Sequence, residues 1–169
     1  LFPAVLRGKI RLKDSNATNP VAVGDIVDYE AEIPEGAAPE SISEHVTLEN
    51  PAAITGVHKR RNYVIRKSTN LSRQSHIIAA NLDRAFLVVT LDFPQVKLPF
   101  LDRLLVTCEV YNVPATIILN KCDLYGQEYD DMRAAFHEIY EGAGYPIIEV
   151  SAHTGQGVEQ LRSIISGKM

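Results

Sequence analysis

The stretch Ala-Thr-Ile-Ile-Leu-Asn-Lys-Cys-Asp, at residues 115–123, joins an apolar run to a group of polar side chains. Its first part, Ala115–Leu119, is short and rich in β-branched residues, which is typical of a strand buried on both faces of a sheet. Open α/β sheets bind ligands at the carboxyl ends of their strands. We therefore expect Asn120, Lys121 and Asp123 to lie at a ligand site.

These three side chains have the chemistry needed to bind a purine, and guanine in particular. A carboxylate such as that of Asp123 can accept from two adjacent N–H groups at once, and guanine offers such a pair. The amide of Asn120 can donate and accept, so it can tie the base-binding loops together, while the stem of Lys121 can lie over the base plane. Asp123 is therefore the candidate guanine-reading residue.

A second apolar run, at residues 147–150, is followed by a turn of small residues, Ser151-Ala152-His153-Thr154-Gly155. In such a turn the Ala152 N–H could donate to the carbonyl oxygen of guanine, which adenine lacks. Adenine would then leave polar groups unpaired, so Asp123 and Ala152 together would reject ATP.

The two segments resemble the fourth and fifth guanine-specificity motifs of the P-loop GTPases. The phosphate loop of that class, Gly-x-x-x-x-Gly-Lys-Ser/Thr, is absent from the sequence, because neither Gly8-Lys9 nor Gly167-Lys168 has the required neighbours. Either the base motifs are accidental, or the phosphate loop follows residue 169 in a circularly permuted domain. We favour the second interpretation.

The chain as a whole resembles the RsgA (YjeQ) family of circularly permuted ribosome-assembly GTPases. Besides the base motifs, the resemblance rests on residues 19–25 (Asn-Pro-Val-Ala-Val-Gly-Asp), 61–66 (Arg-Asn-Tyr-Val-Ile-Arg), 70–76 (Asn-Leu-Ser-Arg-Gln-Ser-His) and 78–83 (Ile-Ala-Ala-Asn-Leu-Asp). It implies an N-terminal OB-type β-barrel, a basic connector and the base motifs. A phosphate loop and a Zn²⁺-binding tail are then expected beyond this sequence.

The resemblance also implies a function. It implies GTP and GDP as ligands with Mg²⁺, and hydrolysis of GTP during late maturation of the small (30S) ribosomal subunit, with that subunit and its rRNA as partners. Ser151 and Ala152 join Asn120, Lys121 and Asp123 as the expected nucleotide-binding residues. Because the phosphate loop and the water-positioning group lie outside the sequence, we expect no catalytic residue here and no hydrolysis by this chain alone.

Two domains are expected, an OB-type RNA-binding domain with its basic connector at residues 1–75 and a partial GTPase domain at residues 76–169. In the first, five strands are predicted, at Ala4–Leu6 and at residues 21–23, 26–33, 53–57 and 63–65, and residues 42–48 are a further possible strand. Their closure into a five-stranded barrel follows from the family resemblance.

The second domain has the pattern β-α-β-α-β-α. Strands are predicted at residues 85–91, Ala115–Leu119 and residues 147–150, with helices at residues 99–112, residues 128–141 and Val158–Ile165. Right-handed crossovers make the three strands parallel, which brings the two base motifs to one edge of the sheet.

The net charge of −4 hides a basic connector, because no acid occurs between Asn50 and Leu82 and six cations give that stretch a charge of +6. The expected RNA-binding residues are Lys59, Arg60, Arg61, Tyr63, Arg66, Lys67 and Arg73. The cations would contact phosphate and Tyr63 could stack on a base. The plainer alternative is a hydrated charged linker. A non-enzymatic rival is an OB-type rRNA-binding module whose α/β half is a scaffold or binds a partner.

Composition bounds the remaining possibilities. Apolar residues make up 46% of the chain, yet no run approaches the ~18 residues of a membrane span and no signal peptide begins it. Two cysteines offer no disulfide framework, and the five histidines form no zinc-like cluster, so we expect no metal site in this sequence. A cytoplasmic monomer without a membrane partner is expected.

Overall fold

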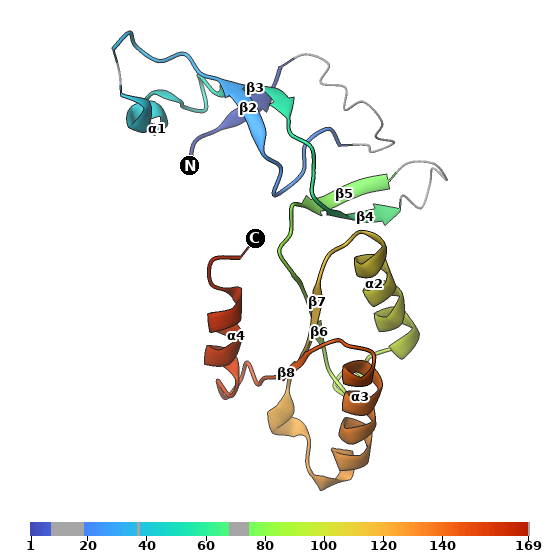
Figure 1. Cartoon of the computed structure of the whole chain (residues 1–169). Helices are drawn as coiled ribbons and strands as arrows, with labels where there is room; N and C mark the ends of the chain where they lie inside the picture. Colours follow the sequence, from blue (N-terminus) through green and yellow to red (C-terminus); the bar gives the residue numbers. More distant parts are fainter. Residues whose placement is uncertain (8–18, 37, 68–74, 169) are drawn as a thin grey trace. The chain divides into compact units, whose positions relative to one another are not determined.

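The structure, a computed structural model, describes residues 1–7, 19–36, 38–67 and 75–168 (Figure 1). Contacts divide the chain into two compact units, Leu1–Asn81 and Leu82–Met169. The expected boundary at residues 75 and 76 falls at the start of strand β5 (Ser75–Ala80), and this strand pairs with β4 (Tyr63–Lys67) inside the first unit.

The first unit contains two small sheets. One has the order β1-β3-β2, with β1 parallel to β3 and β2 antiparallel to it, and the other is the antiparallel pair β4-β5. The other elements of this unit are β1 (Ala4–Leu6), β2 (Val27–Glu30), the 3₁₀ turn η1 (Pro39–Ser41), the short helix α1 (Ile42–His45) and β3 (Ala52–Val57).

The strands of the described residues form no closed barrel, so the expected OB barrel is not confirmed. The strand predicted at residues 42–48 is wrong, because residues 42–45 form α1 and only Val46 of that run is fully buried. The strand predicted at residues 21–23 is reduced to one bridge, between Val23 and Ala79. The cause is a turn at Gly24, which has φ +85°, and the Asp25 carboxylate accepts the Ala22 N–H across it.

Long-range hydrogen bonds from asparagine side chains hold the first unit together. Asn19 donates to the Ile77 carbonyl and accepts the Ile77 N–H, both at 2.9 Å. Asn81 accepts the Arg61 N–H and donates to the Gly24 carbonyl, both at 2.8 Å. The segment that begins at Asn19 is therefore fastened to β5 and to the chain that enters β4.

The second unit confirms the predicted order of strands and helices. Its sheet is parallel throughout, with the order β6-β7-β8. The elements are β6 (Ala85–Val89), α2 (Leu98–Val110), β7 (Ala115–Leu119), the 3₁₀ turns η2 (Cys122–Leu124) and η3 (Gln127–Tyr129), α3 (Asp130–Gly142), β8 (Ile147–Glu149) and α4 (Val158–Ile165). The predicted bounds of β7 and α4 match to the residue.

The sheet of the second unit is covered on both faces, which explains the continuous apolar run of β7. All five residues of β7 are buried. Ile118 packs with Ile148 and Val150, and with Leu161 and Ile164 of α4. Successive side chains of a strand point to opposite faces. Figure 1 shows α4 on one side of the sheet and α2 with α3 on the other. The carboxyl ends of three parallel strands therefore lie together.

Candidate nucleotide-binding site

The two predicted base motifs lie next to each other, because backbone hydrogen bonds continue beyond the ends of the strands. Asn120, directly after β7, donates from its backbone N–H to the Val89 carbonyl at 2.8 Å. Cys122 donates to the Val150 carbonyl, just after β8, at 3.1 Å. The loop after β7 is thus tied to both neighbouring strands.

Asn120 joins the two motifs directly. Its side-chain Oδ1 accepts the backbone N–H of Ala152 at 3.1 Å, as expected of a residue that ties the loops together. This contact uses the Ala152 N–H, which is the group predicted from the sequence to donate to the guanine carbonyl. A guanine at this position would therefore have to share the Ala152 N–H with Asn120 or displace it.

Lys121 and Asp123 differ in what surrounds them. Lys121 has the left-handed φ of +66°, and its ammonium group donates to the carbonyl of Phe93, in the loop after β6. Asp123 lies in η2 and is exposed, and its carboxylate has no hydrogen-bond partner among the described residues. Of the two, Asp123 keeps its polar atoms available to a ligand.

The turn after β8 is held by Ser151, whose side chain is fully buried. Its Oγ accepts the Thr154 N–H at 3.0 Å and its carbonyl accepts the Gly155 N–H at 2.9 Å. Gly157 has φ +72°, and a Cβ there would lie 2.2 Å from the Glu149 carbonyl oxygen. Ser151 and Gly157 therefore fix the turn tightly and leave Ala152 exposed beside Asn120.

A buried tyrosine, which the sequence did not single out, supports the first motif from behind. The Tyr125 hydroxyl donates to the Asn120 carbonyl at 2.7 Å and accepts the Leu91 N–H at 2.9 Å. Burial raises the pKa of Tyr125, so the hydroxyl keeps the proton that it donates. The sequence around Tyr125 does not indicate this role, because its partner Leu91 follows a different strand, β6.

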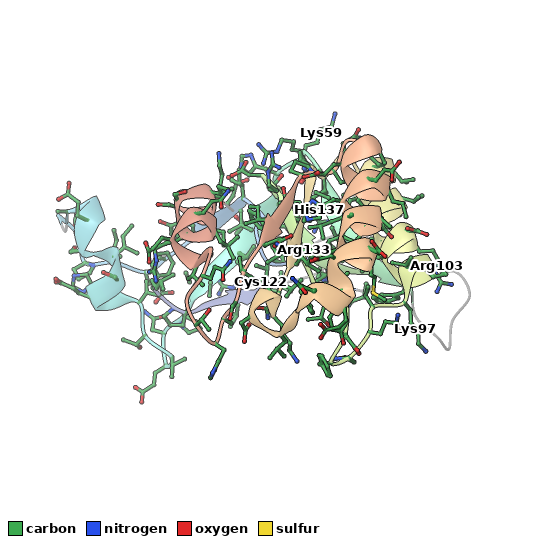
Figure 2. The ribbon with its side chains drawn as sticks, turned by 90° about the horizontal axis from the view of Figure 1, so that it is seen from below. Lys59, Lys97, Arg103, Cys122, Arg133 and His137 are labelled. Carbon is green, nitrogen blue, oxygen red and sulfur yellow. The ribbon has the colours of Figure 1, made fainter. Side chains whose placement is uncertain are left out.

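A second group of interacting side chains, also not predicted from the sequence, lies between α3 and β8. Arg133 donates from Nε to Glu149 at 2.6 Å and from Nη2 to the other carboxylate oxygen, and His137 Nε2 lies 2.8 Å from Glu149. Figure 2 shows Arg133 and His137 on the strand side of α3, near Cys122. Burial alone would raise the pKa of Glu149, but the hydrogen bonds from Arg133 and His137 lower it below its ordinary value.

Arg60, one of the expected RNA-binding residues, is engaged inside the first unit. It donates from Nε and Nη2 to the two carboxylate oxygens of Asp25, each at 2.6 Å, and the two side chains are only 9% and 1% exposed. Burial works against both charges, yet the pKa of Asp25 is lowered by Arg60 and the pKa of Arg60 is raised by Asp25. This geometry leaves little of the guanidinium accessible to a phosphate.

The other expected RNA-binding residues are placed unevenly. Lys59 is exposed (Figure 2), and exposed Arg61 donates to the Asn81 carbonyl at 2.9 Å. Tyr63 begins β4 and is half-buried. Arg66 and Lys67 belong to β4 by their backbone, and their side chains lie outside the described residues, as does all of Arg73.

A cavity of about 850 Å³ lies beside the edge strand β6 and is lined by residues of β6, α2 and the loop between them. Lys97 and Arg103 are part of its wall and are labelled in Figure 2. None of the five expected nucleotide-binding residues lines this cavity. This cavity is therefore not the candidate base site at the carboxyl ends of β7 and β8.

Comparison with known proteins gives a family match and close relatives. The RsgA GTPase family model matches residues 57–169. The small ribosomal subunit biogenesis GTPase RsgA of Flavobacterium johnsoniae is 41% identical over 164 residues, which is 97% of this chain and 47% of that protein. The protein of the same name from Porphyromonas gingivalis is 42% identical over 163 residues, or 96% of this chain and 48% of that protein.

Two solved structures are similar to this fold. The crystal structure of YjeQ from Thermotoga maritima matches with a TM-score of 0.67 and 30% identity, covering 98% of this chain and 49% of that one. YloQ, described as a circularly permuted GTPase, matches with a TM-score of 0.61 and 25% identity, covering 96% and 48%. The chain spans about half the length of the relatives it matches.

The parallel sheet, with its two adjoining loops at the carboxyl ends of β7 and β8, has the fold of the circularly permuted GTPases. Within that class, the chain belongs to the RsgA GTPase family. The family resemblance drawn from the sequence motifs is confirmed.

In the part of the chain that the structure describes, no helix is both long and apolar enough to cross a membrane. Residues 1–7, 19–36, 38–67 and 75–168 also contain no group of three or more His, Cys, Asp or Glu side chains arranged to hold a metal ion.

Proposed function

We propose that this chain is the guanine-recognition part of a GTPase that acts in the biogenesis of the small ribosomal subunit. The observation that carries the proposal is the 3.1 Å contact between Asn120 Oδ1 and the Ala152 N–H, which joins the two base motifs at one sheet edge. Membership of the RsgA GTPase family supports it, and so does the shared name of the relatives.

In the proposed complex, the Asp123 carboxylate accepts from the ring N–H and the exocyclic amine of guanine, and Ala152 donates to the guanine carbonyl. Asn120 and Lys121 hold the base edge and cover its plane, while Ser151 shapes the turn. Asp123 suits this role because its carboxylate is exposed and has no partner among the described residues. Adenine would leave the Asp123 carboxylate without its pair of donors and offers no carbonyl to the Ala152 N–H, so GTP and GDP would bind in preference to ATP.

Hydrolysis of GTP with Mg²⁺ belongs, in this proposal, to the intact protein. Phosphoryl transfer needs a phosphate loop, and no Gly-x-x-x-x-Gly-Lys-Ser/Thr motif occurs in this sequence. The residues of this chain therefore account for the choice of base and not for the rate of the reaction. The intact protein would work in the cytoplasm as a monomer, and this chain alone would be inactive.

The proposed test of guanine recognition is Asp123→Asn in the intact protein. An Asn amide can accept from the ring N–H and donate to the second carbonyl of xanthine, but it cannot accept from both the ring N–H and the amine of guanine, because one of its two polar groups is a donor. We expect GDP affinity to fall by about two orders of magnitude and xanthosine diphosphate to become the preferred ligand. Equilibrium titration with both nucleotides measures this. Unchanged preference would refute the role of Asp123 and favour the rival, a non-enzymatic rRNA-binding module.

We further propose that the first unit binds rRNA as an OB-type domain, through Lys59, Arg61, Tyr63, Arg66, Lys67 and Arg73. Arg60 is left out of this surface because it is paired with buried Asp25. Contacts to phosphate release counterions, so affinity should fall steeply with salt.

Lys59→Glu with Lys67→Glu should weaken the binding of small-subunit rRNA at least tenfold and reduce its salt dependence. Lys97→Glu with Arg103→Glu makes the same change of charge in the second unit and serves as the matched control. Equal losses in both double variants would show that net charge, and not this surface, governs RNA binding.

A further inference from the structure

The loop that follows β6 is fastened to the first base motif by three side chains of residues 121–129. The Lys121 ammonium donates to the Phe93 carbonyl, the Tyr125 hydroxyl accepts the Leu91 N–H, and the Tyr129 hydroxyl donates to Asp92 Oδ2 at 2.9 Å. These contacts bridge 28, 34 and 37 residues of sequence. The two loops are therefore held as one body at the sheet edge.

Tyr125 is the central member of this set. Its side chain is buried, and its hydroxyl uses its single proton for the Asn120 carbonyl and a lone pair for the Leu91 N–H. Both partners are backbone groups, so the contact fixes main chain and not a mobile side chain. Loss of the hydroxyl would remove this partner from the buried Leu91 N–H, and a buried N–H left unpaired is costly.

The fixed carbonyl belongs to the residue that joins the two base motifs. Asn120 carries the side chain that accepts the Ala152 N–H, and its peptide group leads into left-handed Lys121 and then Asp123. A small rotation of this peptide would move the Asn120 amide and the Asp123 carboxylate together. The direction of both depends on what holds the Asn120 carbonyl in place.

We infer that Tyr125 is a positioning residue of the guanine site, which aligns Asn120 and Asp123 by holding the Asn120 carbonyl against the loop after β6. This inference rests on the proposed function, because it assumes that the site binds guanine. Tyr125 does not touch the base in this arrangement. It acts through the backbone, so its loss should change both affinity and the discrimination between bases.

The variant that isolates the hydroxyl is Tyr125→Phe in the intact protein. The ring would stay in place, since it packs against Tyr129 with the ring centroids 5.4 Å apart. Tyr140→Phe is the matched control, because Tyr140 is also buried and its hydroxyl donates to Asp102 at 2.8 Å, away from the base motifs. Tyr125→Phe loses two hydrogen bonds and Tyr140→Phe loses one, so Tyr125→Phe should lower the thermal midpoint more, and binding is measured well below both midpoints.

The readout is equilibrium binding of N-methylanthraniloyl GDP, with inosine diphosphate as competitor. Inosine lacks the amine that Asp123 would bind, so the ratio of the two affinities reports the alignment of Asp123. We expect Tyr125→Phe to weaken GDP binding about tenfold and to lower the preference for GDP over inosine diphosphate, while Tyr140→Phe changes neither.

The outcomes separate the inference from the proposed function. Wild-type protein that binds GDP no better than ADP would refute the proposed function itself. Wild-type protein that selects GDP, together with a Tyr125→Phe variant of unchanged affinity and preference, would refute the positioning role alone. Equal loss of GDP binding in Tyr125→Phe and Tyr140→Phe would also refute it, because it would reflect stability and not alignment.

Discussion

Each of the two units is stabilised internally by a different kind of contact. Among the described residues, the fully buried apolar set of the first unit is small and consists of Val46, Ala52, Ala53, Ile77 and Ala80. The second unit buries a larger set of bulky side chains around β7, including Leu101, Ile117, Ile118, Leu119 and Phe136. The first unit relies instead on directed polar contacts such as Asp25–Arg60 and Asn19–Ile77.

This difference teaches where each unit is vulnerable. Hydrophobic burial is spread over many neighbours, so a core responds to lost volume. A buried ion pair depends on both partners, because removal of one leaves the other charged and desolvated. The second unit should therefore be most sensitive to truncation of its core, and the first to loss of a single charge.

The largest expected effect is that of Ile117→Ala, at the centre of β7, where the side chain is 0% exposed. The cavity should destabilise the second unit by about 4 kcal/mol. Amide hydrogen exchange followed by mass spectrometry measures this, since peptides from β6, β7 and β8 should lose protection while peptides from β3 and β4 keep it. Val88→Ala, on edge strand β6 with the side chain 66% exposed, is the control and should cost less than about 1 kcal/mol. Equal effects of the two variants would contradict the core described here.

The same contrast explains what the sequence could predict of the fold. The second unit was predicted element by element, because an apolar run such as Ala115–Leu119 is a local signal and parallel order follows from right-handed crossovers. The first unit has strands of three to six residues and is fixed by contacts such as Asn19 to Ile77, which are 58 residues apart. No window of sequence contains such a contact. The strand predicted at residues 42–48 was wrong, and the one predicted at residues 21–23 is reduced to a single bridge.

The second largest effect is expected from Arg60→Met, which keeps an unbranched apolar stem and removes the charge. Asp25 would remain buried without its partner, at a cost of about 3 kcal/mol to the first unit. Hydrogen exchange should rise in peptides covering residues 19–25 and 58–63 and stay unchanged in β7. Lys59→Met, at an exposed neighbouring position, should change stability by less than about 0.5 kcal/mol. A loss of stability in Lys59→Met as large as that in Arg60→Met would show that the Asp25–Arg60 ion pair contributes no more than an exposed charge.

Arg60 also marks the limit of sequence reasoning about function. A count of charges treats each cation of the connector as exposed, and nothing near Arg60 in the sequence indicates that Asp25, 35 residues away, takes up its guanidinium. Tyr125 was missed for the same reason, because its partner Leu91 is 34 residues away. By contrast, the contact of Asn120 with Ala152 was foreseeable, since both follow adjacent parallel strands.

The smallest expected effect is the response to acid, which has the same sign in both units. The pKa values of Asp25 and Glu149 are both lowered: burial opposes this, but hydrogen bonds from Arg60, and from Arg133 and His137, outweigh it. A lowered pKa stabilises the folded state above the unfolded values, about 3.9 for Asp and about 4.3 for Glu, and this is lost as the pH falls further. Each unit should therefore lose on the order of 1 kcal/mol as these carboxylates protonate.

In Arg60→Met the main group that lowers the pKa of Asp25 is gone, while the burial that raises it remains. Protonation of Asp25 would then relieve a buried unpaired charge, so acid should no longer destabilise the first unit, whereas the second unit keeps its dependence through Glu149. Hydrogen exchange between pH 6 and pH 3.5, corrected for the intrinsic rates, resolves the two units in one sample. An acid response of the first unit that survives in Arg60→Met would mean that carboxylates other than Asp25 govern it, and the contrast between the units would then rest on core packing alone.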